Sequence, residues 1–191
     1  MEKLLFSKLT KADLAKFVSL EDQGIKNHNW LNVESVSVEL HEAQQLQYLQ
    51  SHLLHYDTHL MNESTIWARA IYPLLLLAEK DFIQAWAEVS LQAQYTEFEL
   101  EGIADGVLAK CVSGFVEIPY LVIVEAKKGL ESQNPVYQLY GQLLAVARLH
   151  WEANQNNLQT VYGCYTIADV WKFVKADIRD INSHPVSMRT G

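Results

Sequence analysis

Two carboxylates and one lysine near the middle of the chain have the types and spacing that hold a divalent metal ion. Glu125 and Lys127 end an apolar strand-like run, and side chains two apart on a strand point to the same face. Asp105 lies on the preceding predicted strand, and a short turn would bring it alongside Glu125. Two carboxylates about 4 Å apart repel by about 4 kcal/mol at an effective dielectric constant of roughly 20. One ammonium group cannot cancel two carboxylates, whereas a divalent cation would.

The kind of ligand narrows the choice of metal. Carboxylate oxygens suit Mg²⁺ or Mn²⁺, while Zn²⁺ favours histidine and cysteine. His52, His55 and His59 would lie on one face of a helix, but neither a cysteine nor a second histidine cluster completes a zinc site. We interpret these histidines as polar helix residues. The alternative for the acidic group itself is a surface salt-bridge cluster with little effect on stability.

The elements that must position these residues follow from changes in hydrophobic period. Residues 86–95 alternate between apolar and polar side chains, which predicts a strand, and Ser113 with Gly114 predicts a turn. The run 120–124 is apolar on both faces, as in a central strand covered on two sides. The other elements predicted in this part of the chain are strands at 100–109, 160–166 and 170–174 and a long helix at 136–154.

Helical spacing dominates before residue 80. Thr10 is a predicted N-cap of a first helix, residues 39–59 form a second, and Asn62 caps a third that Pro73 should kink or split. The predicted fold class is therefore α/β, a mixed α+β sheet with helices packed on it. We expect one domain, with a helical N-terminal extension over residues 1–60 and a core over about 61–175.

Composition limits the setting in which such a site would work. The chain has 191 residues, 49% of them hydrophobic and 20% charged, which is typical of a globular domain. No run of 18 apolar residues suggests a membrane span, and no signal-peptide pattern opens the chain. Cys111 and Cys164 lie far apart, so we expect a reduced, cytoplasmic protein. The net charge of −8 counts against nucleic acid as a partner without excluding a local basic strip.

The motifs around these residues resemble a known family. Asp105-Gly106, followed by the run from Pro119 to Lys127, is similar to the D…ExK signature of the PD-(D/E)XK nuclease superfamily. The sequence around this motif resembles the nuclease domain of type I restriction-enzyme R subunits, and the resemblance covers about residues 63–174. The helix that begins Gln138-Leu139-Tyr140-Gly141-Gln142 is similar to the glutamine-bearing helix of many such nucleases. Ile103 lies two positions before Asp105, with no proline beside the aspartate, which departs slightly from the pattern.

The resemblance implies a restriction-endonuclease-like core and a set of roles. Asp105 and Glu125, with the Ala126 carbonyl, would bind one or two Mg²⁺ or Mn²⁺ ions. Lys127 would orient the attacking water or stabilise developing charge, and Gln138 would hold the substrate or Lys127.

The family also implies a further glutamate and a substrate. Many relatives carry a glutamate on the helix before the hairpin; Glu63 and Glu79 both qualify, and we favour Glu63. The implied activity is metal-dependent hydrolysis of nucleic acid, expected to be DNA, by an endonuclease or exonuclease. The alternatives are a catalytically silent module of the same fold, acting as a homodimer or with a partner subunit, and a plain structural domain.

Overall fold

An eight-stranded sheet forms the centre of the computed structural model, which describes residues 1–24, 28–32, 37–127, 134–167 and 170–191. The strand order is β1-β4-β5-β6-β7-β8-β2, and β3 pairs with β4 off this path. The strands are β1 (Glu2–Leu5), β2 (Val18–Asp22), β3 (Ile83–Gln94), β4 (Phe98–Val112), β5 (Phe115–Lys127), β6 (Gln159–Ile167), β7 (Val170–Arg179) and β8 (Val186–Thr190). The α-helices are α1 (Lys11–Phe17), α2 (Leu40–Leu54), α3 (Glu63–Ile66), α4 (Tyr72–Leu76) and α5 (Pro135–Asn154).

The sheet is mixed, as predicted. β3, β4 and β5 form an antiparallel meander, and β6, β7 and β8 form another. The two meanders join through β5 and β6, which are parallel. Parallel neighbours need a crossover connection, and the 20-residue helix α5 supplies it. The α/β fold class with helices packed on a mixed sheet is confirmed at this level.

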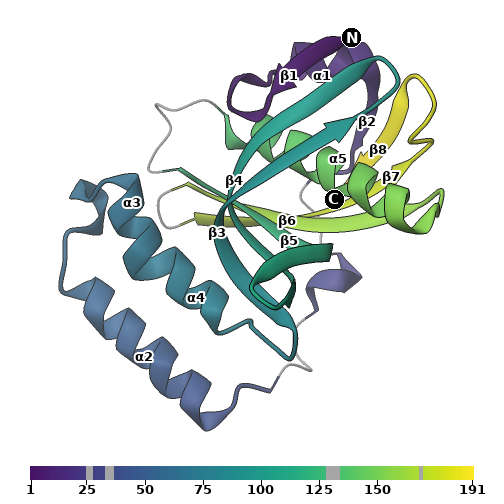
Figure 1. The fold of residues 1–191 in the computed structure, drawn as a ribbon. Coiled ribbons are helices and arrows are strands. Elements are labelled where there is room, and N and C mark those ends of the chain that lie inside the picture. The colour runs from purple at the N-terminus through teal and green to yellow at the C-terminus, as the bar shows by residue number, and fades with distance from the viewer. Residues whose placement is uncertain (25–27, 33–36, 128–133, 168–169) are drawn as a thin grey trace.

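Helices cover the sheet on two faces. Leu139, Leu143 and Val146 of α5 pack with Val107 and Ile123 in the larger core cluster. Their chain neighbours Leu108 and Val124 belong to a second cluster with Leu75 of α4. Because successive strand residues point to opposite faces, α5 and α4 lie on opposite faces of β4 and β5. Figure 1 shows α2, α3 and α4 together on the side away from α5.

The N-terminal segment departs from the predicted helical extension. Thr10 does cap α1, but the helix ends at Phe17 and the chain continues directly as β2. β1 pairs with β4, and β2 pairs with β8, so both belong to the main sheet. A helical extension over residues 1–60 is therefore wrong for these two strands, which have only four and five residues. So few residues give too little alternation to separate a strand from a helix.

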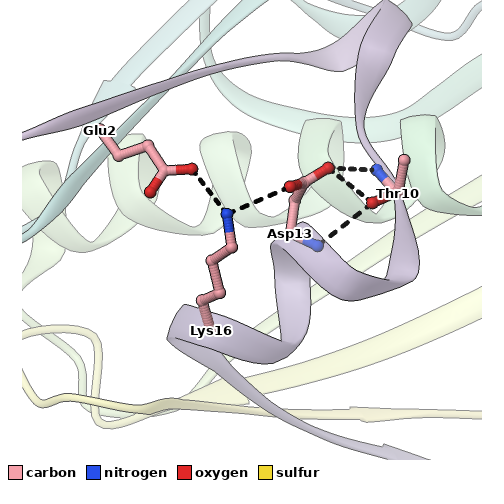
Figure 2. A network of polar contacts seen from close by, with 4 residues as sticks. All are labelled: Glu2, Thr10, Asp13 and Lys16. Atoms are coloured by element: carbon pink, nitrogen blue, oxygen red, sulfur yellow. Dashed lines mark hydrogen bonds and ion pairs between the residues drawn. The ribbon is translucent and has the colours of Figure 1, made fainter.

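Polar contacts attach α1 to the edge of the sheet (Figure 2). The Thr10 side chain accepts a hydrogen bond from the Asp13 backbone N–H at 3.2 Å, and Asp13 accepts one from the Thr10 N–H at 3.1 Å. Such a reciprocal capping box satisfies backbone donors at the start of a helix. Lys16 bridges Asp13 and Glu2 of β1 at 3.4 and 3.0 Å.

The segment before the sheet is helical, as predicted, with a break at the predicted place. The Asn62 side chain caps α3 by accepting the Thr65 N–H at 2.8 Å. A wide π-type turn, Trp67–Ile71, separates α3 from α4, in which Pro73 occupies the first turn. Proline has no N–H to donate to the preceding turn, which accounts for the split. Within the described part of the chain, no helix is long and apolar enough to cross a membrane.

Candidate metal site at a fork in the sheet

β4 and β5 separate at the positions of Asp105 and Glu125. Their ladder runs from the hairpin turn as far as the pair Gly106 and Val124. The remainder of β4 pairs with β1 instead, between Phe98 and Glu101. Asp105 and Glu125 are the next residues after the last ladder pair, so they lie where the sheet forks. The predicted proximity of these two positions thus has a definite structural setting.

Asp105 supports the backbone of β5 at this fork. Its Oδ2 accepts a hydrogen bond from the Ala126 N–H at 2.8 Å. In a continued antiparallel ladder Ala126 would lie opposite Ala104. Because the ladder ends before this pair, the Asp105 carboxylate accepts the hydrogen bond of the Ala126 N–H instead of a backbone carbonyl. A buried backbone N–H needs such a partner, and Ala126 is 2% exposed. Asp105 therefore contributes to the local fold in addition to any chemical role.

Glu125 is fully buried, and α5 holds it. Gln142 of α5 is also fully buried, and its amide group donates to Glu125 Oε2 at 2.9 Å. The same amide approaches the Ile103 carbonyl of β4 at 3.4 Å. One side chain of α5 thereby spans the two strands of the fork and fixes the orientation of the glutamate.

A pocket of about 230 Å³ opens beside the fork. Three carboxylate residues line it: Glu63 of α3, Glu88 of β3 and Asp105 of β4. Its other lining residues are Ser64, Trp67, Ala87 and Ala126. Glu125 is not among the lining residues, because it is covered by α5.

These residues offer the chemistry that a hard cation requires. Carboxylate and main-chain carbonyl oxygens are the ligands of Mg²⁺ and Mn²⁺, and Asp105, Glu63 and Ala126 border one pocket. The residues that the structure describes contain no group of three or more His, Cys, Asp or Glu that could hold a metal ion. The predicted ligand set contains only two such side chains, Asp105 and Glu125, and its third ligand is the backbone carbonyl of Ala126.

The predicted glutamates and glutamine occupy different surroundings. Glu63 borders the pocket with Asp105. Glu79 instead accepts the Ala85 N–H at 2.8 Å, which ties it to the start of β3. Gln138 is 9% exposed on α5, and it is Gln142, one turn further on, that contacts Glu125. Lys127 ends β5; its side chain, and so its predicted role, lies outside what the structure describes.

Two residues of this region have no role in the sequence prediction: Gln142, which belongs to the predicted glutamine-bearing helix but is passed over for Gln138, and Glu88 of β3. Gln142 has the same helix face as Gln138, four residues away, so the pattern alone could not say which of them reaches the sheet. Glu88 has a positive φ of 54° and lies between the ladder pairs Ala87–Gly106 and Val89–Ala104. This left-handed conformation is uncommon for a residue other than glycine, and nothing in the alternating pattern of β3 signals it.

Comparison with known proteins adds no assignment to this geometry. No known protein-family model matches the chain, and no curated protein matches it significantly.

Proposed function

We propose that this protein is a metal-dependent nuclease that hydrolyses phosphodiester bonds of nucleic acid, with DNA as the expected substrate. The observation that carries the proposal is the fork, where Asp105 and Glu125 follow the last ladder pair and Gln142 binds Glu125. The order of elements supports it: a helical segment, a hairpin, the ExK strand, a glutamine-bearing helix and a closing strand pair. This is the order that the resemblance to the PD-(D/E)XK nucleases implies for a restriction-endonuclease-like core.

In this proposal the chain supplies oxygen ligands and holds them in place. Asp105 and the Ala126 carbonyl would bind Mg²⁺ or Mn²⁺ at the pocket, and Glu125 would join them only after its side chain turns out from beneath α5. The metal would polarise a phosphate and lower the pKa of a bound water. Gln142 positions Glu125 through its 2.9 Å hydrogen bond. Glu63 faces the same pocket as Asp105 and would bind a second ion or an ordered water. Lys127 would stabilise the charge that develops on the phosphate.

A second candidate is a catalytically silent module of the same fold that binds nucleic acid or a partner subunit. The net charge of −8 favours it, because an acidic chain is poorly suited to holding a nucleic acid substrate by itself. A silent module would bind its partner without cleaving any nucleic acid.

Cleavage assays separate the two candidates. Plasmid and linear DNA are incubated with the protein in Mg²⁺, in Mn²⁺ and in EDTA. We expect cleavage in Mg²⁺ and in Mn²⁺ and no cleavage in EDTA. Lys127→Ala should abolish cleavage yet keep metal binding, because the lysine acts on water and phosphate and not on the cation. Asp105→Ala should lose both. Glu97→Gln, an exposed carboxylate at the far end of the β3–β4 hairpin, is the matched control and should cleave normally.

Metal binding is measured independently by calorimetry and by melting temperature. A ligand at a hundredfold excess over its Kd stabilises the folded state by about 2.7 kcal/mol. Wild-type protein should therefore melt at a higher temperature in Mg²⁺ than in EDTA. Binding of Mg²⁺ without cleavage of any substrate would favour the silent module. Cleavage by Lys127→Ala at the wild-type rate would overturn the active-site assignment.

A further inference from the structure

A second and larger pocket, of about 330 Å³, lies on the α5 face of the sheet. It is enclosed by the start of α5, by β6, β7 and β8, and by the short helix Asn29–Leu31. Tyr165 forms part of its wall and is the register partner of Glu125 across the parallel β5–β6 pair. Parallel register partners share a face and lie about 4.8 Å apart across the strands. The pocket therefore begins one strand away from Glu125, on the α5 face, whereas the pocket that Asp105 and Glu63 line opens on the side of α3 and α4.

The walls combine flat rings with polar edges. Tyr140, Tyr165 and His28 contribute rings, and the Tyr140 hydroxyl lies 3.3 Å from Thr190 Oγ1. Burial raises the pKa of both tyrosines, so their hydroxyl groups stay protonated at neutral pH. Nε2 of His28 is buried, and it has no hydrogen-bond partner among the residues that the structure describes. A buried polar atom of this kind marks a place where a ligand atom can bond.

We propose that this pocket binds one unpaired nucleobase of a single-stranded nucleic acid, which rests on the proposed nuclease function. A nucleobase has an aromatic face that stacks on tyrosine or histidine and an edge with donors and acceptors. The volume is near the lower end of ligand pockets, about 300–1,000 Å³, which suits a single base. A base within a duplex is stacked and paired, so it cannot enter such a pocket without leaving the helix.

The position of the pocket gives the inference a consequence for substrate choice. A strand with one base in the pocket would have to pass around the sheet to bring a phosphate to the pocket that Asp105 and Glu63 line, because Glu125 itself is buried beneath α5. Lys172 at the pocket wall pairs in register with Tyr165 and supplies a cation for such a backbone, and Asp22 at the same wall supplies an acceptor for donors on the base edge. Because only an unpaired base can enter the pocket, single-stranded ends or flaps should be bound, and so cut, in preference to uninterrupted duplex.

Binding is tested without catalysis, in EDTA, by fluorescence anisotropy. A short labelled single-stranded oligonucleotide is compared with the blunt duplex of the same sequence. His28→Ala and Tyr165→Leu should each weaken single-strand binding about tenfold, as expected for the loss of base stacking, and should leave duplex binding unchanged. Phe115→Ala removes an aromatic ring that is 73% exposed in the β4–β5 hairpin and serves as the matched control. Unlabelled deoxynucleoside monophosphates are added as competitors to detect a pocket for free nucleotides.

The outcomes separate this inference from the proposed function. Equal binding of single strand and duplex by wild type would overturn the inference, as would normal single-strand binding by both pocket variants. If mononucleotides displace the labelled strand at lower concentrations than unlabelled oligonucleotides do, the pocket would be assigned to free nucleotides instead. Loss of single-strand binding in the variants, together with no cleavage by wild type, would support the pocket and refute the nuclease. Cleavage that is unaffected in the variants and shows no single-strand preference would support the nuclease and refute the nucleobase pocket.

Discussion

Replacement of Gln142 by leucine tests whether α5 holds the fork together. Gln142 is fully buried, and its amide group bonds to Glu125 at 2.9 Å and approaches the Ile103 carbonyl at 3.4 Å. Leucine has a similar volume and fits the apolar surroundings of α5, so the change removes the donor with little change in packing. Glu125 then stays buried with one donor fewer.

The expected cost follows from the contacts. A hydrogen bond to a charged group contributes about 1.5–3 kcal/mol, and a buried group that loses its partner costs a similar amount. The second contact is long and should add little. We therefore expect unfolding to become easier by about 2–3 kcal/mol. For a chain of 191 residues, each kcal/mol lowers the Tm by about 2–4 °C, so the Tm should fall by about 4–12 °C.

Thermal and urea denaturation in EDTA measure this effect without a contribution from metal. Gln138→Leu is the control, because Gln138 lies one turn earlier on the same helix and is 9% exposed. Glu125→Leu and the double variant with Gln142→Leu complete a double-mutant cycle. An apolar pair replaces both partners, so the double variant should be more stable than the sum of the single changes predicts. Equal stability of Gln142→Leu and Gln138→Leu, or strict additivity in the cycle, would refute the reasoning.

Three further predictions concern the support of the sheet. Burial lowers the pKa of His150 from 6.5, and its Nε2 accepts the Tyr120 N–H at 3.0 Å. The neutral imidazole therefore stabilises the fold above a pH of about 6.5, and this stability is lost as the pH falls. Acidification from pH about 7 to about 5 should lower the Tm of wild type more than that of His150→Gln; equal slopes would contradict this. A Cβ on Gly106 would lie 2.9 Å from Trp67 Cζ2, so Gly106→Ala should cost about 1–3 kcal/mol and change tryptophan fluorescence; an unchanged spectrum and Tm would count against it. Thr10→Ala should cost about 1 kcal/mol through loss of the α1 cap, measured by urea denaturation, with no effect on metal binding.

Much of the sheet was predictable because its strands and its crossover helix carry long, regular patterns. The alternation in β3 and the apolar run in β5 identified the meander, and the 20-residue helix α5 began within one residue of its predicted start. The predicted strand at 120–124 was too short, since β5 begins at Phe115. Pro119 interrupts the pattern there, in a stretch where the β4–β5 register shifts, and proline cannot donate to a ladder.

The short strands at both ends of the chain were not predictable. β1, β2 and β8 have four or five residues each. β1 and β2 pair with strands distant in sequence, whereas β8 pairs both with the neighbouring β7 and with the distant β2. β1 pairs in parallel with β4, almost a hundred residues away, through Glu2 and Phe98. Such pairing depends on the assembled tertiary structure and leaves no local period in the sequence. β1 pairs with Phe98 to Glu101 of β4, beyond the point at which the β4–β5 ladder ends.

The candidate site was predictable in position but not in orientation. Strand parity and the short hairpin predict Asp105 beside Glu125, and the backbone positions of the two residues follow the last ladder pair. Their side chains have different surroundings, because Asp105 lines the pocket with Glu63 whereas Glu125 is buried against Gln142. This difference follows from the end of the β4–β5 ladder and from the packing of α5 over Glu125. The spacing of the motif residues predicts neither feature.

Asp105 has two roles at the fork, and this affects how its variants must be interpreted. Its carboxylate accepts the Ala126 N–H at 2.8 Å, so alanine would remove a proposed metal ligand and a backbone partner together. Asparagine keeps an amide oxygen that can accept the same hydrogen bond, but it lacks the charge that a divalent cation requires. A stable Asp105→Asn protein that neither binds Mg²⁺ nor cleaves would assign the loss to metal binding. If only Asp105→Ala loses activity, while Asp105→Asn binds Mg²⁺ and cleaves as wild type does, the aspartate serves the strand and not the chemistry.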